Sequence, residues 1–284
     1  MQRIAVITDS GSNISNEESL QFDIHILPLQ ITIDEKTYQD TLDITTEEIF
    51  KLLREGILPK TSMPTYQRME DLLIQLKNEH FDHVIAIPLS SGLSTTSDVL
   101  QTIARDVNIP LTIINTYSTC QLERYIAIRT KQMVDEGASV QEIVNRLTPK
   151  IENANSILLV KDLQHLKRGG RLTPVAASLA SLLKIYPILH LNKKTNGRID
   201  VLDKVRTESK AIKYAIQQTL STMDLKNSVF FLIHTDYPKG IQFIKNVLLE
   251  SGVPAEHIKI EYISSVIAVH TGMECICIQS IEKI

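Results

Sequence analysis

Two short turns rich in hydroxyl groups are the residues of this chain best suited to chemistry. Residues 61–64 (TSMP) form one, and residues 90–94 (SSGLS) form the other, directly after the apolar run 84–89. Hydroxyls and a glycine at the end of a buried strand, followed by a helix, can bind a carboxylate or phosphate with neutral donors and no nearby cation. A third polar cluster, residues 269–272 (VHTG), interrupts an apolar stretch. We therefore expect a ligand that is anionic at one end.

The elements that must position these turns alternate between strand and helix in the first part of the chain. Short apolar runs separated by amphipathic segments predict a parallel sheet covered on both faces. Polar residues follow three of the expected strands, at 8–10, 90–91 and 115–116. Ligands of such sheets bind at the carboxyl ends of the strands, so we expect these three segments to meet at one edge.

The second part of the chain mixes hairpin turns with helices. We therefore predict a two-domain α/β protein, with a parallel-sheet domain over residues 1–155 and a mixed α/β domain with antiparallel strands over residues 156–284. A small-residue helix is expected over 175–183. A strand is expected over 266–278, and it would carry His270.

Composition excludes several classes of protein. The 284 residues have a formal net charge of −3, which favours neither nucleic acid nor a membrane surface as the partner of the whole molecule. The longest apolar stretch contains two prolines and a lysine, so it is a poor membrane span. We expect no secretory leader, and the three cysteines (Cys120, Cys275 and Cys277) are expected to be reduced core residues. These features together predict a cytoplasmic protein.

Common catalytic and metal-binding motifs are absent from the sequence. It contains no G-x-S-x-G, no phosphate-loop lysine motif and no histidines at metal-ligand spacing. Asp9 could act as a nucleophile, but a residue of this type after a strand more often stabilises a turn or caps a helix. An enzyme acting on an anionic small molecule, a hydrolase or phosphotransferase with Asp9 and Ser91 at its centre, remains the alternative. His270 would be its only candidate base.

Seven segments in order give the chain a specific resemblance to the DegV family, which includes the fatty-acid-binding subunits of bacterial fatty acid kinase. The segments are residues 8–10 (TDS), 61–64 (TSMP), 90–94 (SSGLS), 167–171 (KRGGR), 187–189 (PIL), 197–204 with Arg206, and 270–272 (HTG). They span essentially the whole chain.

This resemblance implies a protein that binds a long-chain fatty acid between two domains and is not itself a catalyst. The residues implied to contact the fatty-acid carboxylate are Thr61, Ser62, Ser91, Ser94 and His270. The family role is to present the carboxyl group to a separate ATP-binding fatty acid kinase, which makes an acyl-phosphate for phospholipid synthesis. No resident cofactor or metal is implied.

A basic segment is the expected docking surface for that kinase. Residues 161–213 hold twelve Lys and Arg against four Asp and Glu, and an excess of positive charge suits an acidic partner or an incoming phosphate. Arg206 resembles a position used for kinase docking, and Arg171 is expected to act with it.

Two residues depart from the family pattern. Thr95 replaces a glycine after the second turn, where its side chain could narrow the pocket. Glu274 follows the HTG segment, and we expect it to face solvent because a carboxylate pointing inward would repel an anionic ligand.

Overall fold

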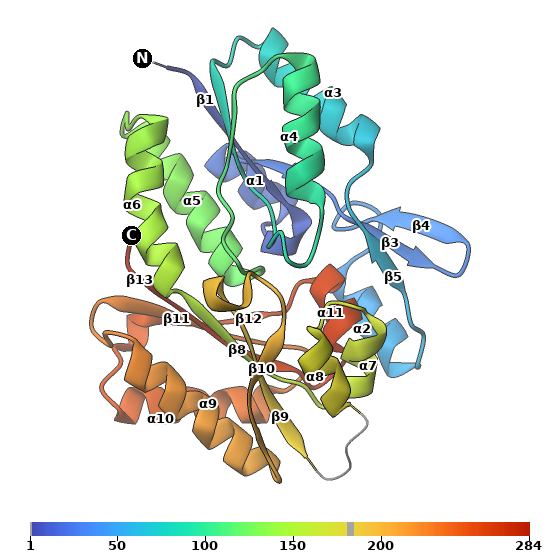
Figure 1. Cartoon of the computed structure of the whole chain (residues 1–284), viewed down its shortest axis with the longest axis vertical. Helices are drawn as coiled ribbons and strands as arrows, with labels where there is room; N and C mark the ends of the chain where they lie inside the picture. The colour runs from blue at the N-terminus through green and yellow to red at the C-terminus, as the bar shows by residue number, and fades with distance from the viewer. Residues whose placement is uncertain (1, 181–184) are drawn as a thin grey trace.

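The computed structural model of the chain describes residues 2–180 and 185–284, which form three β-sheets flanked by helices (Figure 1). A four-stranded sheet and a small three-stranded sheet come first along the chain, and a six-stranded sheet follows from β8 (Asn155–Leu159) onwards. The predicted α/β fold, with a parallel sheet first and a mixed sheet second, is confirmed.

The first sheet is parallel throughout. Its order is β2 (His25–Leu27), β1 (Ile4–Asp9), β6 (His83–Ile87) and β7 (Leu111–Ile113). Two helices, α3 (Tyr66–Asn78) and α4 (Thr96–Val107), pack on one face, and α5 (Gln121–Asp135) packs on the other. Because β1, β6 and β7 are neighbours, the polar segments that follow them lie at one edge of this sheet, as predicted.

The six-stranded sheet is mixed. Its order is β10 (Asp200–Val205), β9 (Tyr186–Leu191), β8, β13 (Ile276–Glu282), β11 (Ser228–His234) and β12 (Ile258–Tyr262), and every neighbouring pair is antiparallel except β11 and β12. Two helices, α9 (Glu208–Thr222) and α10 (Pro238–Glu250), cover its outer face. Its inner face packs against α5 and α6 (Val140–Asn153), so one hydrophobic core runs from the first sheet into the second.

The small sheet and its helices connect the two larger sheets. It consists of β4 (Lys36–Gln39), β3 (Gln30–Ile33) and β5 (Lys60–Ser62). Beside it lie α2 (Thr46–Arg54) and α11 (Ser265–Thr271), which share a hydrophobic cluster with Ile31 and Leu89. The remaining elements are α1 (Asn16–Phe22), α7 (Leu163–Arg168), α8 (Pro174–Leu179) and the 3-10 turns η1 (Ser10–Ser12), η2 (Lys193–Thr195) and η3 (Ala255–His257).

The strand predicted over 266–278 is wrong, because the structure has α11 there and begins β13 only at Ile276. Five of the seven α11 residues are buried, so the sequence shows no amphipathic period that would indicate a helix. The Val and Ile residues of this segment favour a strand. Gly272, at φ 73°, ends the helix in a conformation that suits glycine. The helix predicted over 175–183 begins as α8, and its residues 181–183 lie outside the described part of the chain.

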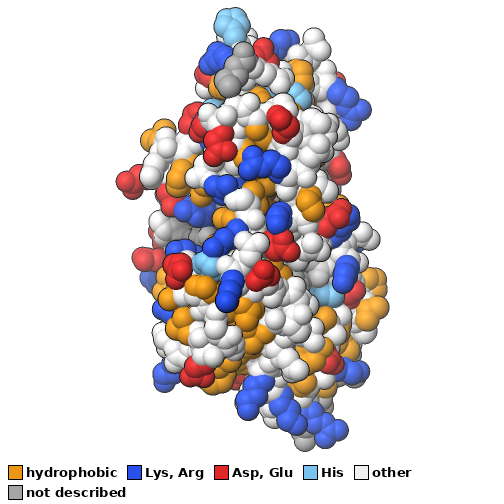
Figure 2. Space-filling model, turned by 90° about the vertical axis from the view of Figure 1, so that its left-hand side faces the viewer, with side chains coloured by type: hydrophobic (Ala, Val, Ile, Leu, Met, Phe, Trp, Pro, Cys, Tyr) orange, Lys and Arg blue, Asp and Glu red, His pale blue; other side chains and the backbone are white. Residues whose placement is uncertain are grey.

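The surface carries mixed charge. On the face shown in Figure 2, acidic and basic side chains are interspersed over most of the molecule, and hydrophobic side chains gather mainly in its lower half. In the described part of the chain no helix is both long and apolar enough to cross a bilayer.

Candidate functional site

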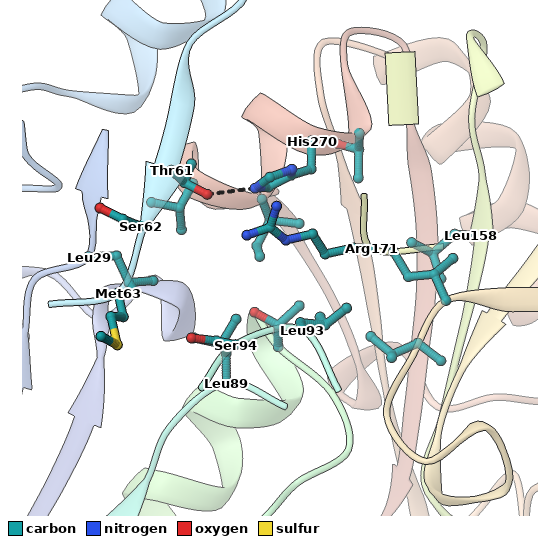
Figure 3. A pocket seen from close by; sticks show the side chains of 16 residues that line it. Leu29, Thr61, Ser62, Met63, Leu89, Leu93, Ser94, Leu158, Arg171 and His270 are labelled. Carbon is teal, nitrogen blue, oxygen red and sulfur yellow. Dashed lines mark hydrogen bonds between the residues drawn. The ribbon is translucent and has the colours of Figure 1, made fainter. Parts of the chain in front are cut away.

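A cavity lies where the small sheet, the carboxyl edge of the parallel sheet and the mixed sheet meet (Figure 3). Most of its wall surface is apolar, and seven of its sixteen lining residues carry polar side chains. The lining residues are Leu29, Thr61, Ser62, Met63, Leu89, Leu93, Ser94, Thr119, Leu158, Arg171, Leu191, Ile199, Val266, Ile267, His270 and Thr271. They come from both parts of the chain, so the cavity exists only when the parts are packed together.

A threonine and a histidine form the polar end of this cavity. Thr61 lies on β5 and His270 on α11, and Thr61 Oγ1 is 2.6 Å from His270 Nε2. Burial, with help from the charge of Arg171, lowers the pKa of His270 to about 3. The imidazole is therefore neutral at physiological pH and can donate one hydrogen bond while accepting another. If Nε2 carries the proton, the Thr61 hydroxyl is free to donate to a ligand.

Arg171 supplies a positive charge at the same place. It lies between α7 and α8, its Nη1 donates to the Gly169 carbonyl at 2.5 Å, and its guanidinium lies beside the His270 ring (Figure 3). The sequence analysis named only neutral donors for an anion, and the structure adds a cation beside them. Arg171, which the sequence analysis assigned to a docking surface, lines the cavity, and its assignment to a docking surface stays a prediction.

A second hollow lies against the polar end of the cavity. The two share Thr61, Arg171 and His270 as a common wall. Cationic and titratable side chains of Lys60, His165 and Arg168 also line the outer hollow, and no Asp or Glu is among its described lining residues. An anionic group at the common wall would therefore have positive charge on its outer side.

The other predicted carboxylate contacts divide into two groups. Ser62 and Ser94 line the cavity. Ser91 is exposed and is not among the lining residues, and its hydroxyl accepts a 2.6 Å hydrogen bond from Asn115 Nδ2. Its neighbour Ser90 is buried and donates to the Gly197 carbonyl at 2.8 Å, which joins the second hydroxyl turn to the loop between β9 and β10.

The residues that depart from the family pattern lie at the edge of the site. Thr95 is exposed, and its hydroxyl contacts the Met63 sulfur at 3.6 Å, so it touches a wall residue from outside. Glu274 is exposed and forms an ion pair with Lys161 at 3.2 Å, which confirms that it faces solvent. Arg206 is exposed just beyond the end of β10.

Sequence reasoning missed a set of buried carboxyl groups beneath the cavity. Asp9, Asp40 and Glu123 are fully buried. Asp9 accepts hydrogen bonds from the Gly11 and Leu89 backbone N–H groups, so the predicted structural role in a turn is confirmed. Nothing in the sequence links Asp9 to Glu123, because 114 positions separate them along the chain.

The three cysteines lie in the hydrophobic core. Cys120, Cys275 and Cys277 are free and buried, as predicted. Across residues 2–180 and 185–284, no group of three or more His, Cys, Asp or Glu side chains is arranged to hold a metal ion.

Comparison with known proteins decides the family. The sequence model of the DegV family matches residues 3–283. Its description calls the members uncharacterised proteins. The chain belongs to the DegV family. It is 30% identical to a DegV domain-containing protein of Streptococcus pneumoniae over 284 residues, which cover 99% of this chain and all of the relative. It is 34% identical to one of Caldanaerobacter subterraneus, with 87% of this chain and 88% of that relative covered.

Solved DegV structures share the fold over the full length of the chain. A fatty acid binding DegV family protein from Streptococcus agalactiae superposes with a TM-score of 0.91 at 29% identity, and all of both chains is covered. DegV from Bacillus subtilis, described as a fatty acid binding protein, gives a TM-score of 0.86 at 28% identity, again with both chains fully covered.

Proposed function

We propose that this DegV protein binds one long-chain fatty acid in the cavity, with its carboxylate at Thr61, His270 and Arg171. The observation that carries the proposal is the combination of a largely apolar wall with one cationic, hydrogen-bonding end. Such a cavity matches the two-part chemistry of a fatty acid. The similarity to the fatty acid binding proteins of S. agalactiae and B. subtilis supports it.

The acyl chain supplies most of the affinity in this proposal. Burying roughly a dozen methylenes at about 0.8 kcal/mol each yields on the order of 10 kcal/mol before the costs of association. Those costs are at least several kcal/mol. Leu158, Leu191 and Ile199, at the side of the cavity formed by the mixed sheet, would contact the tail.

The head group fixes the register of the chain. Arg171 provides a charge-assisted hydrogen bond, which is about twice as strong as a neutral one. Ser62 and Ser94 are further donors within the lining. Ser91 lies outside the lining and would join them only after its turn shifts. Its hydroxyl accepts from Asn115 but keeps its own proton to donate.

We further propose that the carboxylate is presented to a separate ATP-binding fatty acid kinase in the cytoplasm, with no cofactor resident on this chain. The outer hollow lies on the far side of the carboxylate wall, and its positive charge suits an approaching phosphate. Arg206 would contact the kinase. In this arrangement residues 1–155 and 156–284 act as two domains that hold the lipid between them.

The enzyme alternative finds little support in the geometry. Asp9 is fully buried and its carboxylate oxygens accept hydrogen bonds from backbone N–H groups, so no substrate reaches it. His270 pairs with Thr61 rather than with Ser91, and therefore no activated serine is assembled.

Mass spectrometry of small molecules released by denaturing the purified protein tests the binding proposal. A stoichiometric long-chain fatty acid is the expected result, and its mass gives the chain length. A protein that releases none and fails to take up added oleate would overturn the proposal. Presentation is tested by acyl-phosphate formation with a fatty acid kinase and ATP, where Arg206→Glu should reduce turnover without changing oleate affinity.

A further inference from the structure

A pair of buried carboxyl groups lies beneath the fatty-acid cavity. Asp9 ends β1, and Glu123 lies in the first turn of α5. One oxygen of each carboxyl group lies beside Gly11. A methyl group added at Gly11 would be 2.8 Å from Asp9 Oδ1 and 3.4 Å from Glu123 Oε2. Thr8 Oγ1 lies 3.0 Å from Glu123 Oε1, and the side chains of Asp9 and Glu123 are within hydrogen-bonding reach of each other. Glu123 Oε2 is completely buried and receives no hydrogen bond from an N–H or hydroxyl donor.

No positive charge balances this pair. Neither carboxyl group forms an ion pair with any Lys, Arg or His of the described residues. The ionisable groups packed around the pair are Asp40, Cys120 and, beyond Cys120, Cys275 and Cys277. All of these are neutral or negative, and two adjacent buried carboxylates without a cation are strongly unfavourable.

The pKa shifts agree with this geometry. Burial raises the pKa of Asp9 to about 7. Burial and the neighbouring Asp9 carboxyl raise the pKa of Glu123 well above its usual range. At neutral pH the two groups therefore hold at least one proton, and their titration belongs to the pair rather than to either residue.

The pair is connected to the cavity floor through the backbone. The N–H of Leu89, which lines the cavity, donates to Asp9 Oδ2 at 2.9 Å. The N–H of Leu29, also in the wall, donates to Ser10 Oγ at 3.0 Å. Thr119 Oγ1 donates to the Gly11 carbonyl at 3.4 Å. Three wall residues are thus attached to residues 9–11.

We propose that Asp9 and Glu123 are positioning residues that share a proton, and that this proton keeps the cavity floor in the form that binds fatty acid. The inference rests on the proposed function. Loss of the proton would leave two like charges in contact and drive the end of β1 away from α5, carrying Leu89 and Thr119 with it. An acyl chain packed against the floor of the cavity would exclude water further from the Asp9–Glu123 pair. The pair would therefore hold its proton more tightly in the fatty-acid-bound protein than in the free protein.

Oleate affinity measured between pH 6 and 9 tests this linkage. The wild-type affinity should fall by up to tenfold per pH unit above about pH 7, because one proton is required. Glu123→Gln keeps the shape and the hydrogen-bonding ability of the side chain without its titration, so its affinity should change less than twofold over the same range. Glu136→Gln, at the exposed end of the same helix, is the matched control and should follow the wild type.

Calorimetry in two buffers of different ionisation enthalpy gives a second readout. Uptake of close to one proton per oleate at pH 8 is expected for the wild type, with none in Glu123→Gln. Equal pH profiles for all three proteins, or no proton uptake, would refute the shared proton while leaving fatty acid binding intact. An affinity that follows the Na⁺ or K⁺ concentration at fixed ionic strength would also refute it. Absence of oleate binding at every pH would instead refute the proposed function.

Discussion

Replacement of Arg171 by methionine would separate the proposed head-group contact from the rest of the proposed lipid binding. Arg171→Met keeps a long apolar stem but removes the only guanidinium among the described residues that line the cavity. A hydrogen bond to a charged group contributes about 2 kcal/mol, which corresponds to about a thirtyfold loss of affinity at 1.4 kcal/mol per factor of ten. The loss should be confined to ligands that carry a carboxylate.

Binding of oleate and of oleyl alcohol, measured by displacement of a fluorescent fatty acid, makes that comparison. Oleate should bind the variant about thirtyfold more weakly, and oleyl alcohol should bind both proteins equally. Arg206→Met, in which an exposed arginine outside the cavity is changed in the same way, is the control and should leave both affinities unchanged. An equal loss for the two ligands would mean that Arg171 only packs against the tail. No loss for either would place the carboxylate elsewhere.

Three further perturbations follow from the contacts described above. Thr61→Val removes the hydroxyl that lies 2.6 Å from His270 Nε2. Oleate binding should weaken about fivefold, which is the effect of losing one neutral hydrogen bond of about 1 kcal/mol. Unchanged affinity in the same displacement assay would argue against a head group at this wall. The raised pKa values of Asp9 and Glu123 contribute a free energy of unfolding that falls as pH rises from about 4 to 7, whereas the lowered pKa of buried His270 contributes one that rises. The histidine contribution is common to both proteins, so urea titrations should show the stability of the wild type falling relative to that of Glu123→Gln over this range. A constant difference between the two proteins would contradict the buried pair. Gly92→Ala would place a methyl group 2.3 Å from the Gly197 carbonyl oxygen and should lower the free energy of unfolding by about 1–3 kcal/mol. A thermal midpoint equal to that of the wild type would show that the turn at residues 90–94 and the loop between β9 and β10 move apart freely.

Local patterns predicted the elements that lie next to each other in the sequence. The hydroxyl turns, the alternation of strands and helices and the meeting of polar strand ends at one edge all follow from short-range rules, and the structure has them. α11 was mistaken for a strand because nearly all its side chains are buried, which removes the periodic signal that distinguishes a helix from a strand.

Contacts between distant residues could not be predicted in the same way. The position of Arg171 depends on how the loop after α7 folds back onto α11, and a basic segment by itself favours a solvent-exposed interpretation. The pairing of Asp9 with Glu123 depends on how α5 packs across β1. Neither arrangement leaves a signature in residue type or spacing.

The place of β13 in the mixed sheet has a consequence for how the molecule is made. β13 is synthesised after every other strand described above, yet it lies between β8 and β11 and pairs with both. Until β13 emerges from the ribosome, no strand joins β10, β9 and β8 to β11 and β12. All strands of the parallel sheet have been synthesised by then. Because domains fold as units in the order of their synthesis, a nascent chain passes through a stage in which one sheet is formed and the inner face of the other is still open. Ribosomal stalling before residue 276 would leave a chain that exposes this apolar face, and such a chain would be a substrate for chaperones and proteases.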